Sequence, residues 1–127
     1  MPHALIVDDN SVNVQVLETL LAKQGVTSTR VLDPVKLAAT VADLGHLDVV
    51  FLDLEMPHLT GYEVMARLKA DTRFDGIPVV AYTVHMSQIQ EAHSAGFHSF
   101  IPKPIDPKRF PDQLERILSG EPVWERV

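Results

Sequence analysis

Short apolar runs alternate along the chain with amphipathic segments, and this alternation restricts the fold more than any other feature of the sequence. Five runs have the length of a strand, at residues 4–9, 26–31, 48–53, 77–82 and 100–104. The segments between them repeat apolar residues at the spacing of a helix. Strands that alternate with helices predict βα units around one parallel sheet, with helices on both of its faces.

The run at residues 48–53 is apolar nearly throughout. An edge strand, or a strand with one face in solvent, would instead alternate apolar and polar residues. We therefore expect this strand to lie in the centre of the sheet, with Asp53 at its end.

Several residues predict where helices begin. Asn10 or Ser11 can cap the first helix, and the Asp33-Pro34 and Asp106-Pro107 pairs have the sequence of an N-cap followed by proline. A third helix is expected to open at Thr60. The apolar face of the first helix is expected to consist of Val12, Val16, Leu17, Leu20 and Leu21.

The composition is that of one globular domain. With 127 residues, 46% of them hydrophobic, the chain fits one domain over residues 1–120, followed by a short tail at 121–127. No stretch approaches the roughly 18 apolar residues of a membrane span, and there is no signal peptide and no cysteine, so we expect a cytoplasmic protein away from membranes. The net charge of -6, without a basic cluster, argues against nucleic acid and favours protein partners.

Charged residues stand where three of the runs end: Asp8 and Asp9, Asp53, and Lys103. Ligands of open α/β sheets bind at the carboxyl ends of the strands, where these side chains would meet. Three carboxylates repel one another unless a cation lies among them, and a set of hard oxygen ligands suits Mg²⁺. Asp53 can then act as nucleophile towards a phosphoryl group, with Lys103 and the hydroxyl of Thr83 as partners for its oxygens.

With these positions in this order, the chain resembles the response-regulator receiver domain of two-component signalling over roughly residues 3–119. The resemblance is carried by Leu5-Ile6-Val7-Asp8-Asp9-Asn10, Phe51-Leu52-Asp53-Leu54-Glu55-Met56-Pro57, Gly61, Ala81-Tyr82-Thr83 and Lys103-Pro104. It implies a flavodoxin-like (βα)5 fold, doubly wound, whose five-stranded parallel sheet has the order 2-1-3-4-5. It also implies that Lys103-Pro104 is a cis peptide bond.

The resemblance implies a role for each site residue. Asp53 would be the phosphoacceptor, receiving phosphate from a histidine kinase or a phosphotransfer protein. Asp8 and Asp9 would bind Mg²⁺, Asp9 directly and Asp8 partly through water, with the backbone carbonyl of Glu55 completing the set. Such a protein catalyses only its own phosphorylation and dephosphorylation, so it is not an enzyme in the usual sense.

The resemblance also implies how phosphorylation would change a binding surface away from the site. Thr83 would close on the phosphoryl group, and Phe100 would turn inward as Thr83 moves. Together they would reshape the face formed by the fourth helix, the fifth strand and the fifth helix, which would bind a downstream target protein and is also a candidate for homodimerisation.

Three residues are expected to set the speed of the phosphorylation cycle. Val84 stands where receivers usually have alanine or glycine beside the phosphoryl group. Glu55 and His85 each lie two residues after a site residue, at positions that tend to direct or obstruct water in this family. Val84 and His85 together suggest a slowed cycle.

Three other functions remain open at this point. One is a receiver-like scaffold that is not phosphorylated, and another is a fragment of a larger regulator or hybrid kinase. An aspartyl-nucleophile phosphatase of the haloacid-dehalogenase type would need a second aspartate where Glu55 stands, and a substrate cap. For Trp124, in the tail, both packing onto the domain and contact with a partner are open.

Overall fold

The five predicted strands pair in parallel in one sheet of order β2-β1-β3-β4-β5, which confirms the predicted fold class and strand order. The computed structural model describes residues 2–56 and 59–124; Pro57 of the quoted motif and the last three tail residues lie outside them. The strands are β1 (His3–Val7), β2 (Thr27–Val31), β3 (Val49–Asp53), β4 (Val79–Thr83) and β5 (Ser99–Pro102).

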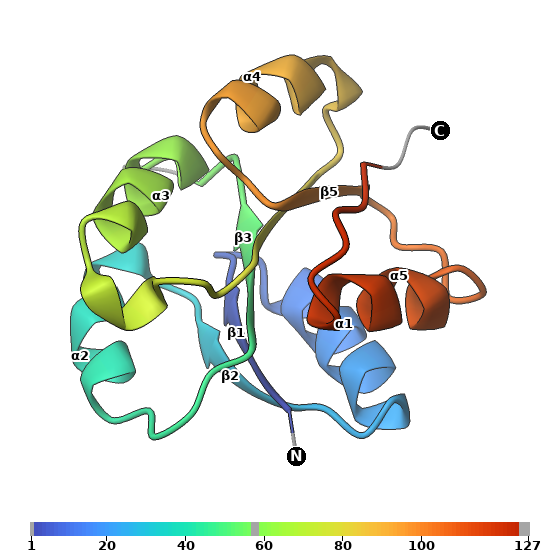
Figure 1. Ribbon diagram of the computed structural model, residues 1–127, viewed down its shortest axis with the longest axis horizontal. Coiled ribbons are helices and arrows are strands. Elements are labelled where there is room, and N and C mark those ends of the chain that lie inside the picture. Colours follow the sequence, from blue (N-terminus) through green and yellow to red (C-terminus); the bar gives the residue numbers. More distant parts are fainter. Residues whose placement is uncertain (1, 57–58, 125–127) are drawn as a thin grey trace.

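Helices cover both faces of the sheet, with α1 and α5 on one side and α2, α3 and α4 on the other (Figure 1). The helices are α1 (Ser11–Lys23), α2 (Leu37–Ala42), α3 (Gly61–Lys69), α4 (Ile89–Ser94) and α5 (Phe110–Leu118), with short 3-10 helices at Pro34–Lys36, Thr72–Phe74 and Met86–Gln88. In the described ranges, no helix combines the length and the apolar character that crossing a membrane requires.

Strand β3 contributes residues to both hydrophobic cores, because neighbouring residues of a strand point to opposite faces. All five of its residues are buried. Val50 and Leu52 pack with α2, α3 and α4, whereas Val49 and Phe51 pack with α1 and α5. The prediction of a central strand is confirmed, and Asp53 ends it between β1 and β4.

The predicted apolar face of α1 is partly wrong. Val12 and Val16 are 67% and 49% exposed, and the helix buries Val14 together with the three predicted leucines. A helix turns about 100° per residue, which places Val12 about 180° from Leu21. Val12 therefore faces away from the core, and Val16 lies at the border of the buried stripe; the spacing of the apolar residues alone did not separate these two valines from the buried residues.

The start of α5 also differs from the prediction. Asp106 does not cap the helix; its Oδ1 accepts a hydrogen bond from the backbone N–H of Lys108, which closes a turn. The helix begins at Phe110, and Pro111 occupies its first turn. The cap at Asn10 is confirmed, since its side chain accepts from the N–H groups of Val12 and Asn13.

Candidate functional site

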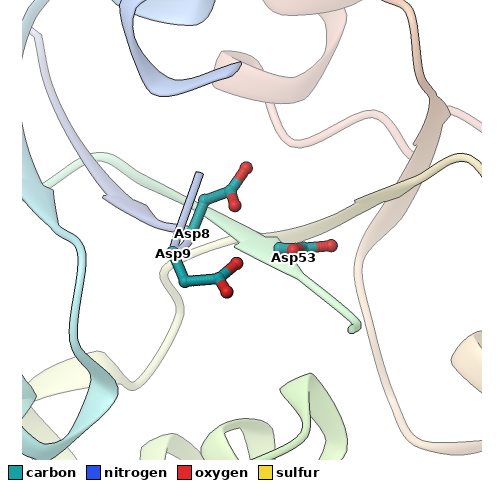
Figure 2. A group of neighbouring side chains, drawn as sticks. All are labelled: Asp8, Asp9 and Asp53. Atoms are coloured by element: carbon teal, nitrogen blue, oxygen red, sulfur yellow. The ribbon is translucent and has the colours of Figure 1, made fainter. Parts of the chain in front are cut away.

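Three aspartates meet at the carboxyl ends of β1 and β3. The register of the two strands pairs Val7 with Leu52, so the residues that follow lie side by side. One carboxylate oxygen from each of Asp8, Asp9 and Asp53 lies within 4.8 Å of the others. Figure 2 shows the three side chains extending from the two strand ends towards the same region. Asp8 and Asp53 are buried and Asp9 is exposed, so the group opens to solvent on one side.

Lys103 joins this group from the end of β5. Its ammonium lies 3.1 Å from Oδ2 of Asp8 and 3.4 Å from Oδ1 of Asp53, and its side chain is only 11% exposed. One ammonium thus contacts two of the three carboxylates, and the group keeps an excess of negative charge. The excess negative charge suits a divalent cation with oxygen ligands. The Lys103–Pro104 peptide bond is cis, as the resemblance implies.

Asp53 is held in an environment that favours its neutral form. Burial is the main cause and raises the pKa of Asp53 to about 6 from its ordinary 3.8; the ammonium of Lys103 opposes this rise and the charge of Asp8 adds to it. The backbone N–H of Glu55 also donates to Oδ1 of Asp53, at 3.3 Å. Lys103 and the N–H of Glu55 therefore both contact Oδ1 of Asp53.

Asp8 has both of its oxygens engaged by the protein. Oδ1 accepts from the backbone N–H of Asn10 at 2.9 Å. Oδ2 accepts from the hydroxyl of Tyr82 at 2.7 Å and from Lys103 at 3.1 Å. Asp8 is consequently fixed in position, and it can act on a nearby cation through its charge and through water more readily than as a direct ligand.

Tyr82 was not among the predicted site residues, although it contacts two of them. Its ring centroid lies 4.3 Å from the ammonium of Lys103, within the range of a cation–π interaction. Burial and the carboxylate of Asp8 strongly raise the pKa of the Tyr82 phenol, which therefore stays a donor. One sequence signal pointed to it: a tyrosine in an otherwise aliphatic buried strand needs a partner for its hydroxyl.

Thr83 lies in β4, and Phe100 lies in the adjacent strand β5. Thr83 is buried at the end of β4, its carbonyl accepts from the N–H of Lys103 at 2.9 Å, and its hydroxyl oxygen accepts from the N–H of His85 at 3.3 Å. Phe100 is completely buried and pairs with Ala81 in the sheet register. Their movement on phosphorylation stays a prediction.

The loops that follow β3 and β4 are linked to each other. The imidazole Nε2 of His85 lies 2.8 Å from one carboxylate oxygen of Glu55, and the amide of Gln88 donates to the other at 2.7 Å. The hydroxyl of Tyr62 then donates to Gln88 at 2.9 Å, which extends the chain of contacts to α3. Two of the three predicted rate-setting residues are thus in contact, while Val84 is 62% exposed.

Gly61 allows the helix α3 to start against the site. A Cβ atom there would collide with the backbone carbonyl oxygen of Asp53 and the Cα of Leu54. The N–H of Gly61 donates to the carbonyl of Leu54 at 3.0 Å, so the close approach is also a hydrogen-bonded one. Only glycine fits at this contact.

A parallel five-stranded sheet with this acidic cluster and lysine defines a receiver-type protein, and comparison with known families agrees. The model of the response regulator receiver domain matches residues 4–115, so the chain belongs to that family. Receiver domains are signalling proteins of two-component systems rather than enzymes that turn over a separate substrate.

Relatives that match nearly all of the chain include a chemotaxis protein and a polar-differentiation response regulator. The chain is 31% identical to the chemotaxis protein CheY of Pseudomonas aeruginosa over 116 residues, which are 90% of this chain and 94% of that protein. It is 29% identical to the polar-differentiation response regulator DivK of Brucella ovis, with the same coverage. Stress response regulator protein 1 of Candida tropicalis is 34% identical, but only 40% of its length is matched.

Solved structures show the same fold. The chemotaxis protein CheY4 of Vibrio cholerae aligns with a TM-score of 0.81 at 24% identity, covering 92% of this chain and 98% of that one. The receiver domain of a sensor histidine kinase from Pseudomonas aeruginosa, solved with a magnesium ion in its active-site cleft, aligns with a TM-score of 0.81 at 24% identity, covering 93% and 98%.

Proposed function

We propose that this chain is the response regulator of a two-component phosphorelay and accepts a phosphoryl group on Asp53. The observation that carries the proposal is the convergence of Asp53 with Asp8, Asp9 and Lys103 at one edge of the sheet. The donor is a phosphohistidine of a histidine kinase or of a phosphotransfer protein. Membership of the receiver family supports this assignment.

Mg²⁺ is the cofactor that the site residues fit. The carboxylates of Asp9 and Asp53 and the backbone carbonyl of Glu55 would hold it, and Asp8 would contribute through water because its own oxygens are engaged. The bound ion supplies neutralisation of the incoming phosphoryl oxygens. The magnesium ion in the related receiver structure supports this choice of metal.

The transfer step uses the two oxygens of Asp53 differently. Lys103 and the N–H of Glu55 both contact Oδ1, so we assign the attack to Oδ2. Its lone pair forms the new O–P bond as the P–N bond to the donor histidine breaks, and the electron pair of that bond leaves with the imidazole. Lys103 then moves from the carboxylates to a phosphoryl oxygen, and the hydroxyl of Thr83 donates to another.

The output is a change in the face formed by α4, β5 and α5. A phosphoryl group adds almost two negative charges and three acceptor oxygens, enough to draw Thr83 and the loop after β4 towards the site. Phe100 follows, and the altered face binds a downstream target protein. The same face is the candidate surface for a homodimer.

Phosphorylation in vitro tests the proposal. Incubation with Mg²⁺ and acetyl phosphate is expected to add one phosphoryl group to the parent protein, detected by intact mass, and Asp53→Asn is expected to abolish it. Asp43→Asn, at an exposed aspartate after α2, is the matched control and should be phosphorylated like the parent. A parent protein that stays unmodified would favour the scaffold function.

A further inference from the structure

Residues 121–124 lie along the outer edge of β5, where the chain returns from α5 (Figure 1). The N–H of Phe100 donates to the carbonyl of Val123 at 2.7 Å, and the N–H of Val123 donates to the hydroxyl of Ser99 at 2.9 Å. Trp124 forms an isolated parallel bridge with Phe100. This segment therefore extends the sheet as a short sixth strand does.

Val123 and Trp124, the last two residues of this segment, are buried to different degrees. Val123 is 1% exposed and packs in the core with α1 and α5. Trp124 packs on the other side, against the core that contains Phe100, and stays partly exposed. Val123 thus anchors the segment, while the indole of Trp124 lies at the surface.

Trp124 covers the residue that is expected to switch. Its ring is stacked on Phe100, with centroids 6.3 Å apart and planes 14° apart, and its centroid lies 4.7 Å from that of His93 on α4. Ile89 and Gln90 of the same helix line a small pocket beside it. Because Phe100 itself is completely buried, the atoms that a partner meets at this point belong to Trp124 and α4.

We propose that Trp124 is a positioning residue for Phe100 and that its indole carries the movement of Phe100 to the protein surface. In the resting state the stack holds Phe100 in place; when Asp53 is phosphorylated, Phe100 turns, the stack breaks, and the indole swings into solvent over α4 while Val123 stays bound. The inference rests on the proposed function, because phosphorylation drives the change. It assigns the recognition of the activated face to an aromatic side chain that lies outside the group of Asp8, Asp9, Asp53 and Lys103.

Trp124 is the single tryptophan of the chain, so its fluorescence reports on this position alone. After treatment with Mg²⁺ and acetyl phosphate, acrylamide quenching of the emission is expected to increase by about twofold or more, and in Asp53→Asn it should not change. Intact mass of the same sample shows whether the protein is phosphorylated. A phosphorylated protein with unchanged quenching overturns the inference, whereas an unmodified parent counts against the proposed function alone.

Hydrogen exchange of the backbone amides tests whether Val123 stays bound to β5. The N–H of Phe100 is bonded to Val123 and should stay protected after phosphorylation, as should the N–H of His98, which is bonded to the carbonyl of Val79 in β4. If exchange at Phe100 accelerates while exchange at His98 does not, the whole segment leaves the sheet, and the anchored swing of Trp124 is wrong.

Variants of the two stacked residues test the stack further, and the first of them needs no phosphorylation. In unphosphorylated Phe100→Leu, which keeps an apolar side chain in the core, quenching of Trp124 is expected to rise by about twofold, and an unchanged value in a folded variant overturns the inference. Trp124→Ala is expected to be phosphorylated about threefold faster, because Phe100 can then turn without breaking the stack, and Trp124→Phe should restore the parent rate. Equal rates in all three proteins would show that Trp124 serves packing only.

Discussion

The hydroxyl of Tyr82 donates a 2.7 Å hydrogen bond to Oδ2 of Asp8, and both side chains are almost completely buried. Tyr82→Phe removes the donor and leaves a buried carboxylate with one partner fewer. We expect a loss of about 1–3 kcal/mol in the free energy of unfolding, measured with urea. Tyr62→Phe removes a hydroxyl that donates to Gln88 at a partly buried site, and it should lose less than about 1 kcal/mol. Equal losses in the two variants would contradict the importance of the Asp8 contact.

The raised pKa of Asp53 predicts a dependence of stability on pH. The folded protein binds this proton more tightly than the unfolded chain, so the stabilisation is complete below about pH 4 and is lost as pH rises towards about 6. Asp53→Asn should abolish the loss and, without divalent ions, be more stable than the parent at pH 7 by about 1–2 kcal/mol, after allowance for screening by water.

Urea unfolding of the parent and of Asp53→Asn at pH 4 and pH 7 measures this difference. Asp43→Asn, at an exposed position, should keep the pH profile of the parent. Addition of Mg²⁺ at pH 7 should reduce the gap between the parent and Asp53→Asn, because the ion stabilises only the ionised carboxylate. A profile that is identical in all three proteins would mean that Asp53 titrates normally.

The contact between His85 and Glu55 predicts a slower loss of phosphate. It bridges the loops after β3 and β4, and we expect it to obstruct water at the phosphorylated Asp53. His85→Ala should shorten the lifetime of the acyl phosphate by up to about fivefold, since a half-exposed pair contributes at most about 1 kcal/mol. His46→Ala breaks a pair of the same 2.8 Å length with Asp48, at the opposite end of β3, and should leave the lifetime unchanged.

Val84 is expected to slow the cycle through its bulk. Because its side chain is 62% exposed, Val84→Ala should change the stability by less than about 0.5 kcal/mol. We expect phosphorylation by acetyl phosphate and loss of phosphate to become about threefold faster, equivalent to about 0.65 kcal/mol of barrier. Rates equal to those of the parent in both directions would remove Val84 from the residues that set the speed.

Gly61→Ala should damage both stability and the site. The added Cβ meets backbone atoms of Asp53 and Leu54, which cannot turn away as a flexible side chain can. We expect a loss of about 1–3 kcal/mol in urea unfolding, together with slower phosphorylation of Asp53. Gly45→Ala is the matched control, because a Cβ there meets no atom within 4 Å. If both variants behave alike, the approach of α3 to Asp53 is not critical.

The periodicity of the sequence predicted the architecture well because it reflects burial directly. The unbroken apolar run of β3 could only fit a strand covered on both faces, and the structure places that strand in the centre. The same reasoning failed for α1, where Val12 and Val16 repeat at helical spacing but face solvent. Spacing identifies apolar positions on a helix; which of them are buried depends on the sheet against which the helix packs.

By itself, the sequence determined which charged residues stand at the ends of the strands: Asp8 and Asp9 after the first, Asp53 at the end of the third, and Lys103 after the fifth. Parallel strands bring their carboxyl ends to one edge, so these positions had to converge. Only the tertiary structure decided which oxygen meets which donor. The contact of Tyr82 with Asp8, and that of Trp124 with Phe100, join residues 74 and 24 positions apart. Such pairs depend on strand register and on the return of the chain beside β5, which no local pattern encodes.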